Sequence, residues 1–267
     1  MSLVHAVLLG IVQGLTEFLP ISSSGHLVIL QHLIGFKGPD VLFDTFLHIG
    51  TLLSVCIVFK SDLYRMGRSL VRRERDSPDF RLLVLVSLGT LPTALIGYIF
   101  RDFFEKQFAA LLPTGSMLLV TGGLLFLSDR ITSNSKSQSE IRKRDGCCIG
   151  IVQGLSIFPG LSRSGSTIST GIFLGLEREC AARFSFLLSV PAIAGAGMLQ
   201  IFELKELSGS LLLPFVMGTL TSAVTGYGAI RILLKMVVRR KLSLFSYYCW
   251  TVGLGVLLVS LIRIFAY

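Results

Sequence analysis

A cluster of polar side chains interrupts an otherwise apolar stretch near the N-terminus. Residues 17–26 read Glu-Phe-Leu-Pro-Ile-Ser-Ser-Ser-Gly-His, and the segments on either side, MSLVHAVLLGIVQGL and LVILQHLIGF, are almost entirely apolar. Gln13 and Glu17 are four residues apart and therefore share one face of a helix. Pro20 should end that helix, because proline cannot donate the next backbone hydrogen bond. The groups that could do chemistry here are Gln13, Glu17, Ser22, Ser23, Ser24 and His26.

The same pattern returns once along the chain. GIVQGLTEFLPISSSGHL at 10–27 aligns without a gap with GIVQGLSIFPGLSRSGST at 150–167, an offset of 140. The repetition predicts that the chain arose by duplication and that the second copy forms a second polar tip. That tip contributes Pro159, Gly160, Ser162, Arg163, Ser164, Ser166 and Thr167.

Together the two tips supply the groups that bind a phosphate. Helix N-termini bind anions, and arginine binds phosphate through two parallel hydrogen bonds, so we expect Arg163 to hold a phosphate. Glu17 fits an anion site if it binds a divalent cation or acts as a base. The remaining expected substrate-binding residues are Gln13, Ser22, Ser24, Ser162, Ser164 and Thr167. For each serine the alternative is that it only caps a helix.

The residues leave the attacking group open. Ser23 or His26 could be the nucleophile, or His26 could deprotonate Ser23 or a water molecule. Ser23 with His26 as base is the favoured arrangement, with the other ring nitrogen of His26 meeting Glu17. Asp44 and His48 share a helical face, and we interpret them as a packing pair or as support for the site.

The composition is that of an integral membrane protein. The 267 residues are 52% hydrophobic and 15% charged, with a mean hydropathy of +0.73. A membrane-spanning helix needs about 20 mostly apolar residues. The segments that meet this requirement are 41–59, 82–100, 111–128, 184–203, 211–234 and 244–265.

Basic residues concentrate in three stretches, 60–81, 129–145 and 235–241, which the positive-inside rule places in the cytoplasm. This location explains the net charge of +9 without a nucleic-acid partner. Both termini and the stretch 101–110 are then external. Segments 1–36 and 146–180 each begin and end on one side, so each should be a re-entrant hairpin.

The predicted fold is therefore an all-α polytopic membrane protein. It has six transmembrane helices plus two re-entrant helical hairpins in an inverted-topology repeat. We expect a single membrane domain over 1–267, with the first repeat at 1–128 and the second at 146–267. The two polar tips should meet near the middle of the membrane, where inverted repeats usually place their sites.

The two motifs resemble those of the bacterial undecaprenyl pyrophosphate phosphatases, the bacitracin-resistance family. Gln13-Gly-Leu-Thr-Glu17 is similar to the first motif of that family, although some members have glutamate at the position of Gln13. Its second motif, Pro-Gly-x-Ser-Arg-Ser-x-x-Thr, is matched from Pro159 to Thr167. The resemblance covers essentially the whole chain and includes FSFLLSVP at 184–191.

The resemblance implies an enzyme that removes the terminal phosphate of a polyprenyl diphosphate and so recycles the carrier lipid of cell-wall synthesis. It also implies a divalent cation, Mg²⁺ or Ca²⁺, with Glu17 as its ligand. The expected location is the bacterial cytoplasmic (inner) membrane, with the active site open to the periplasm. The expected partners of the protein are the polyprenyl diphosphate lipid and the membrane, and a homodimer is compatible with this expectation. A lipid-phosphate flippase or ion-coupled transporter is the alternative that the inverted repeat favours. A resemblance to type-2 phosphatidic acid phosphatases fails, because no histidine follows Ser162-Arg163 closely.

Overall fold

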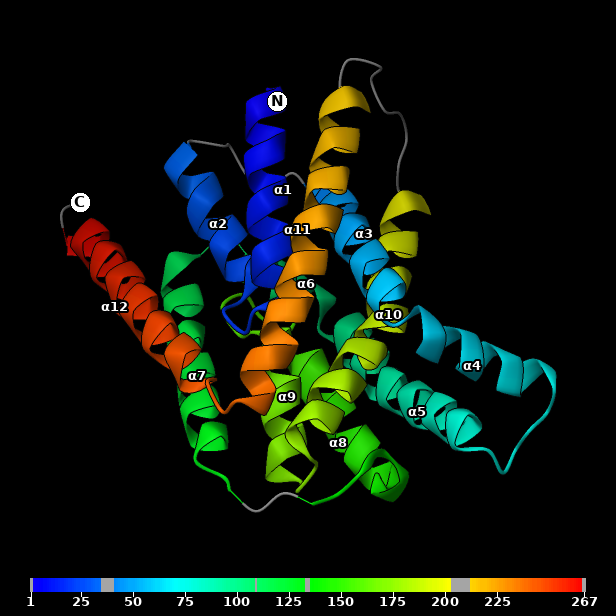
Figure 1. Ribbon diagram of the computed structural model, residues 1–267. Coiled ribbons are helices and arrows are strands. Elements are labelled where there is room, and N and C mark those ends of the chain that lie inside the picture. The colour runs from blue at the N-terminus through cyan, green and yellow to red at the C-terminus, as the bar shows by residue number, and fades with distance from the viewer. Residues whose placement is uncertain (1, 35–40, 109, 133–134, 203–211, 266–267) are drawn as a thin grey trace.

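The computed structural model describes residues 2–34, 41–108, 110–132, 135–202 and 212–265, and these residues form an all-helical protein (Figure 1). Within this part of the chain the only β-type pairing is an isolated bridge between Lys136 and Leu176. The helices are α1 (Leu3–Phe18), α2 (Ser23–Ile34), α3 (Val41–Val58), α4 (Lys60–Val71), α5 (Pro78–Ile99), α6 (Arg101–Gln107), α7 (Leu111–Asp129), η1 (Gln138–Glu140), α8 (Lys143–Leu155), α9 (Arg163–Phe173), α10 (Arg178–Phe202), α11 (Leu212–Val238) and α12 (Ser243–Phe265).

Five helices, α5, α7, α10, α11 and α12, are each long and apolar enough to cross a membrane. The first predicted span is α3, which meets the same criteria only together with α4, after a bend of 79°. The predicted class of a polytopic helical membrane protein is confirmed.

The basic stretch 60–81 is more ordered than predicted. Residues Lys60–Val71 form α4 rather than a loop, and α5 begins at Pro78, four residues before the predicted 82. Asp62, Met66 and Ser69 are buried on one face of α4 while its remaining face is largely exposed. The sequence did not predict this amphipathic helix, because its buried face includes a charged residue, Asp62. The stretch 101–110 likewise contains a short helix, α6.

Each predicted hairpin is a pair of short helices broken at its polar motif. In Figure 1, α1 and α2 enter from the upper end and α8 and α9 from the lower end. The first break, at 19–22, contains Pro20 and a Ser22 residue with φ 71°, an uncommon conformation outside glycine. The second break contains Gly160 at φ 91°, where an added Cβ would lie 2.2 Å from the carbonyl oxygen of Thr114. Residue type therefore accounts for the backbone at Pro20 and Gly160, whereas Ser22 adopts a conformation that serine does not favour.

The glycines of the repeated motif set how closely the hairpins pack. A Cβ on Gly14 of α1 would lie 2.5 Å from the carbonyl oxygen of Ser222 in α11, and a Cβ on Gly150 of α8 would lie 2.0 Å from that of Gly89 in α5. Small residues at four-residue spacing allow helix backbones to approach this closely in membrane proteins. The first helix of each half is therefore packed against a long helix of the other half.

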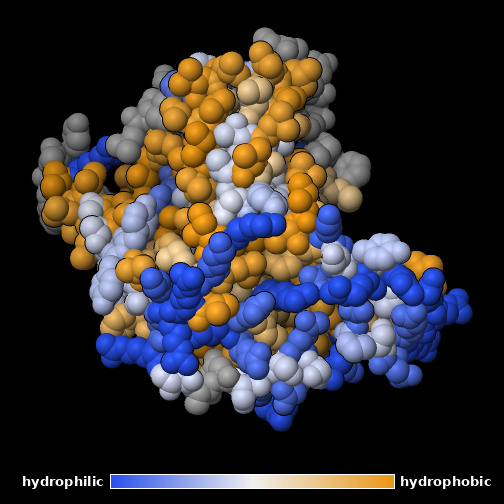
Figure 2. Space-filling view, in the orientation of Figure 1, coloured by the Kyte–Doolittle hydropathy of each residue, from blue (hydrophilic) through white to orange (hydrophobic). Residues whose placement is uncertain are grey.

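The two tips touch each other in the centre of the molecule. The backbone N–H of Gly160 donates to Ser22 Oγ at 3.1 Å, and a Cβ on Gly165 would lie 3.2 Å from Pro20. Figure 2 shows hydrophobic residues over much of the upper part of this face and hydrophilic residues gathered below. The turns after α4, α7 and α11 lie towards the lower end, whereas α1 begins and α12 ends towards the upper end (Figure 1).

Candidate active site

Glu17, at the C-terminal end of α1, is the centre of the polar cluster. It is 7% exposed, and its two carboxylate oxygens meet side chains from four helices. Arg163 Nη2 lies 2.5 Å from Oε1, while Ser23 Oγ donates to Oε2 at 2.6 Å and Gln13 Nε2 donates to the same oxygen at 3.1 Å. His48 Nε2 lies 3.6 Å from Oε2. A buried carboxylate is tolerated only with partners of this kind.

Arg163 is the first residue of α9 and reaches across from the second tip to the first. Its side chain is 15% exposed, and only Nη2 is used by Glu17. Its other terminal nitrogen, Nη1, is buried and has no hydrogen-bond partner among the described residues. A guanidinium presents a planar fork of donors that fits phosphate oxygens, so this free edge suits an anionic ligand.

Ser22, Ser23 and Ser24 follow the break in the first hairpin but point to different partners. Only Ser23 bonds to Glu17, whereas the Ser22 and Ser24 hydroxyls lie 3.3 Å from each other. Ser22 Oγ also accepts hydrogen bonds from the backbone N–H groups of Gly25 and Gly160. Ser22 thus joins the two tips, and Ser23 is the hydroxyl that is placed for chemistry at the carboxylate.

His26 does not face Glu17, so this part of the sequence interpretation is wrong. Its Nδ1–H donates to the carbonyl of Ser22 at 2.8 Å, which leaves Nε2 of the neutral ring to accept from Tyr248 Oη at 2.7 Å. The two rings stack with centroids 5.6 Å apart and planes 11° apart. Tyr248 lies on α12, 222 residues away in sequence, and nothing in its local sequence identifies it as part of the site.

His48 on α3 is the histidine that meets Glu17. Its Nδ1–H donates to the backbone carbonyl of Asp44 at 2.7 Å, and this bond turns Nε2 towards the carboxylate. The sequence placed Asp44 and His48 on one helical face but assigned them to packing or support. The direct approach to Glu17 depends on how α3 lies against α1, which the sequence does not encode locally.

The other predicted ligands are deeply buried around these groups. Gln13 is fully buried, and its Oε1 has no partner among the described residues. Ser162 Oγ caps α9 by accepting from the N–H of Gly165. Ser164 lies 3.3 Å from Ser162 Oγ, while Thr167 Oγ1 donates to the carbonyl of Arg163 and lies 2.6 Å from Ser185 Oγ. These hydroxyls hold the start of α9, and with it Arg163, in place.

A divalent cation fits this cluster only with help from a ligand. No group of three His, Cys, Asp or Glu side chains comes together anywhere in the described part of the chain. Mg²⁺ is commonly held by one or two carboxylates while substrate phosphates supply further oxygens. Glu17 provides a protein oxygen for such an arrangement, and the side-chain amide of Gln13, whose Nε2 donates to Glu17 and whose Oε1 has no partner among the described residues, could provide a second after a flip.

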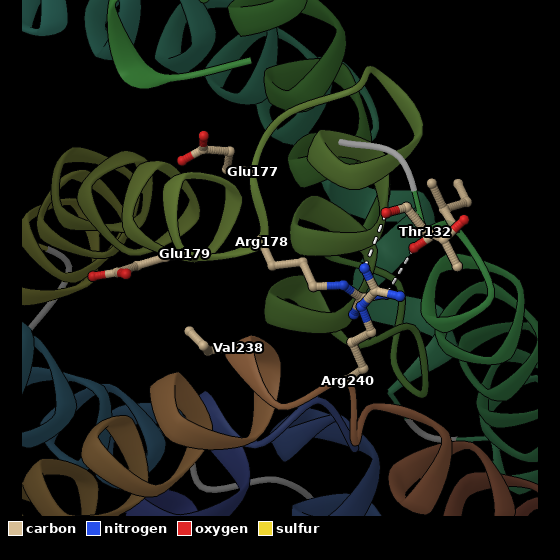
Figure 3. A pocket seen from close by; sticks show the side chains of 7 residues that line it. Thr132, Glu177, Arg178, Glu179, Val238 and Arg240 are labelled. Atoms are coloured by element: carbon tan, nitrogen blue, oxygen red, sulfur yellow. Dashed lines mark hydrogen bonds between the residues drawn. The ribbon is translucent and has the colours of Figure 1, made fainter. Parts of the chain in front are cut away.

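A separate pocket lies between the ends of α7, α10 and α11 (Figure 3), and its two arginines already have hydrogen-bond partners. Arg178 pairs with the carboxylate of Asp129 at 2.9 Å and donates to three backbone carbonyls near the end of α7. Arg240 donates to the carbonyl of Thr132 at 2.9 Å. These arginines cap the C-terminal end of α7, where cations are favoured, so their role in the pocket is structural.

Comparison with known proteins assigns the chain to a family. The family model described as "Bacitracin resistance protein BacA" matches residues 6–255. A relative from Desulfosudis oleivorans named undecaprenyl-diphosphatase is 46% identical over 262 residues, which cover 94% of this chain and 96% of the relative. Relatives with the same name from Halothermothrix orenii and Syntrophotalea carbinolica are 41% identical (97% of this chain, 99% of the relative) and 44% identical (95% and 97%).

Proposed function

The chain belongs to the bacitracin resistance protein BacA family, and we propose from this membership and from the site that it hydrolyses the terminal phosphate of undecaprenyl diphosphate. The product, undecaprenyl phosphate, is the carrier lipid recycled for peptidoglycan synthesis, and its regeneration gives resistance to bacitracin. The single observation that carries the proposal is Arg163, which pairs with Glu17 through one nitrogen and keeps a second buried nitrogen with no partner among the described residues.

Arg163 is placed to hold the diphosphate. Its unpartnered Nη1 can bond a phosphate oxygen while the start of α2 presents N–H groups from the facing tip. An anion bound here would lie between the two tips, next to Ser23. The isoprenoid tail would extend between the apolar helices into the membrane.

Ser23 is the nucleophile that the geometry favours, with Glu17 as the proton acceptor. Ser23 Oγ already donates to Glu17 Oε2 at 2.6 Å, whereas both ring nitrogens of His26 are engaged elsewhere. Attack of Ser23 Oγ on the terminal phosphorus forms a phosphoserine, breaks the bond to the bridging oxygen and releases undecaprenyl phosphate. Water then hydrolyses the phosphoserine and releases inorganic phosphate.

Glu17 and Gln13 Oε1 would hold a divalent cation, Mg²⁺ or Ca²⁺, together with diphosphate oxygens. When bound, such an ion neutralises part of the negative charge on the diphosphate. The dependence is tested by removing the ion with EDTA, which should abolish turnover, and by restoring activity with each cation separately.

Phosphate release by the purified protein tests the activity. In detergent there are no compartments, so release of inorganic phosphate from a C15 or longer polyprenyl diphosphate reports hydrolysis and not transport. The undecaprenyl-diphosphatase relatives favour hydrolysis over the flippase or transporter alternative. Absence of phosphate release with all polyprenyl diphosphates, in protein that retains its fold, would contradict the proposal.

The proposed location is the bacterial inner membrane, with the three basic stretches in the cytoplasm and the site open to the periplasm. With the three basic stretches on one side of the membrane, the proposed repeats 1–128 and 146–267 have opposite orientations, as an inverted repeat requires. In a background without native cysteines, a membrane-impermeant thiol reagent added outside should modify a cysteine at position 105 and spare one at position 74. The reverse labelling would contradict this orientation.

A homodimer is a further proposal about the protein in the membrane. Light scattering of the detergent-purified protein tests it, because the protein mass separates from the detergent mass. A protein mass near 29.2 kDa, the mass of one chain, would contradict the dimer.

A further inference from the structure

His48 Nε2 and Glu17 Oε2 face each other 3.6 Å apart, in a position where both could bind one cation. His48 Nδ1 lies 2.7 Å from the backbone carbonyl of Asp44, and because a carbonyl can only accept, Nδ1 carries the proton. Nε2 then faces the carboxylate oxygen Oε2 of Glu17 at 3.6 Å, an oxygen that also accepts hydrogen bonds from Ser23 Oγ and Gln13 Nε2. Two electron-pair donors in this position attract one cation between them.

We propose that His48 Nε2 and Glu17 Oε2 are two ligands of the catalytic divalent cation. The inference rests on the proposed function, because oxygens of the bound diphosphate complete the coordination. A metal-binding histidine almost always donates its other ring N–H to a carboxylate, a carbonyl or water, and the bond from His48 to Asp44 has this form. Among the described residues no group of three His, Cys, Asp or Glu side chains could hold a metal ion. One histidine and one carboxylate therefore suit an ion that binds together with its substrate.

The surroundings support a shared site for the ion and the diphosphate. Arg163 occupies the other oxygen of Glu17, so a dication at Oε2 would be repelled until an anion joins it. Gln13 Nε2 donates to Oε2, and Gln13 Oε1 is buried without a partner among the described residues, so a flip of this side-chain amide would present its oxygen here as a third protein ligand. The His48 side chain is 34% exposed whereas Glu17 is 6% exposed, so the histidine lies on the accessible side of the carboxylate.

The nitrogen ligand has a consequence for the choice of metal. Imidazole binds transition metals such as Mn²⁺ and Co²⁺ better than it binds Ca²⁺, which prefers oxygen ligands. Replacing His48 by glutamine exchanges the nitrogen for an amide oxygen of similar reach. We therefore expect the His48→Gln variant to lose affinity for Mn²⁺ by about tenfold or more while its affinity for Ca²⁺ changes less.

Pulsed electron paramagnetic resonance of Mn²⁺ tests the proposal directly. The full-length protein in detergent is loaded with Mn²⁺ and a polyprenyl methylenediphosphonate, which is not hydrolysed and contains no nitrogen. The wild-type protein should show ¹⁴N modulation from a coordinated imidazole, His48→Gln should lack it, and His26→Gln should retain it. An unchanged melting temperature of the metal-free variants confirms that each is folded.

The outcomes separate the ligand assignment from the proposed function. If the wild-type protein releases phosphate but shows no imidazole modulation, or binds no Mn²⁺, His48 is not a ligand and the hydrolase remains. Modulation that persists in His48→Gln overturns the assignment in the same way. If modulation is present but no polyprenyl diphosphate is hydrolysed, the proposed function fails although the metal site stands.

Discussion

Replacing Arg163 by lysine is the sharpest test of how the site binds diphosphate. In the structure Arg163 Nη2 is 2.5 Å from Glu17 Oε1, and Nη1 is buried with no partner in the described part of the chain. One guanidinium can therefore bond Glu17 and a phosphate oxygen at the same time. A lysine keeps the positive charge, but its single ammonium group cannot reproduce this planar fork.

The expected loss follows from the hydrogen bonds that each variant gives up. A hydrogen bond to a charged group contributes about 1.5–3 kcal/mol, so losing the one to phosphate should lower kcat/KM by roughly 10- to 150-fold. Arg163→Ala also leaves the buried Glu17 carboxylate without its ion-pair partner, at a cost of about 3–5 kcal/mol. We expect the alanine variant to show a loss in kcat/KM of about 150-fold or more.

The assay is release of inorganic phosphate by detergent-purified enzyme, with kcat/KM normalised to folded protein. Arg130→Lys is the matched control, because Arg130 is exposed at the end of α7 and stacks over Phe126 with Cζ 4.2 Å from the ring centroid. The control should keep wild-type kcat/KM. Wild-type kcat/KM in Arg163→Lys would show that the guanidinium is only a distant counter-charge, and it would refute the proposal that Arg163 bonds Glu17 and a phosphate oxygen at the same time.

Three further predictions follow from contacts elsewhere in the structure. Gly150→Ala should lower the melting temperature in detergent, because its Cβ would lie 2.0 Å from a backbone oxygen and overpacking costs about 1–3 kcal/mol. Gly123→Ala should not, because no atom of the described residues lies within 4 Å of the new Cβ. Ser23→Ala should lower kcat by at least about 10³-fold and abolish the phosphoenzyme trapped by rapid acid quench; a phosphohistidine trapped instead would transfer the nucleophile role to His26. Tyr248→Phe keeps the stacked ring but removes the hydroxyl that donates a hydrogen bond to His26 Nε2. Loss of this bond, about 1 kcal/mol, should lower kcat/KM about fivefold. An unchanged kcat/KM would show that the bond does not matter for turnover.

The sequence alone determined the fold class and the two halves of the site. Long apolar segments predict membrane-spanning helices, because in lipid every backbone N–H and C=O group must form its hydrogen bond within the segment. Pro20 and Gly160 each mark the break in a hairpin, since one removes a donor and the other takes a φ of 91° that other residues avoid. Intramembrane charges are costly and therefore functional, which identified Glu17 and Arg163 before their contact was known.

Tertiary structure alone decided which neighbours complete the site. His26 and His48 are both polar residues next to apolar segments, and helical spacing does not tell which of them reaches Glu17. The packing of α3 brings His48 to the carboxylate, while Tyr248 on α12 takes Nε2 of His26. The contact between His26 and Tyr248, 222 residues apart, depends on how whole helices pack. That packing is set jointly by many contacts along the helices, such as the close approach of Gly150 to α5. No local pattern of residues carries that information.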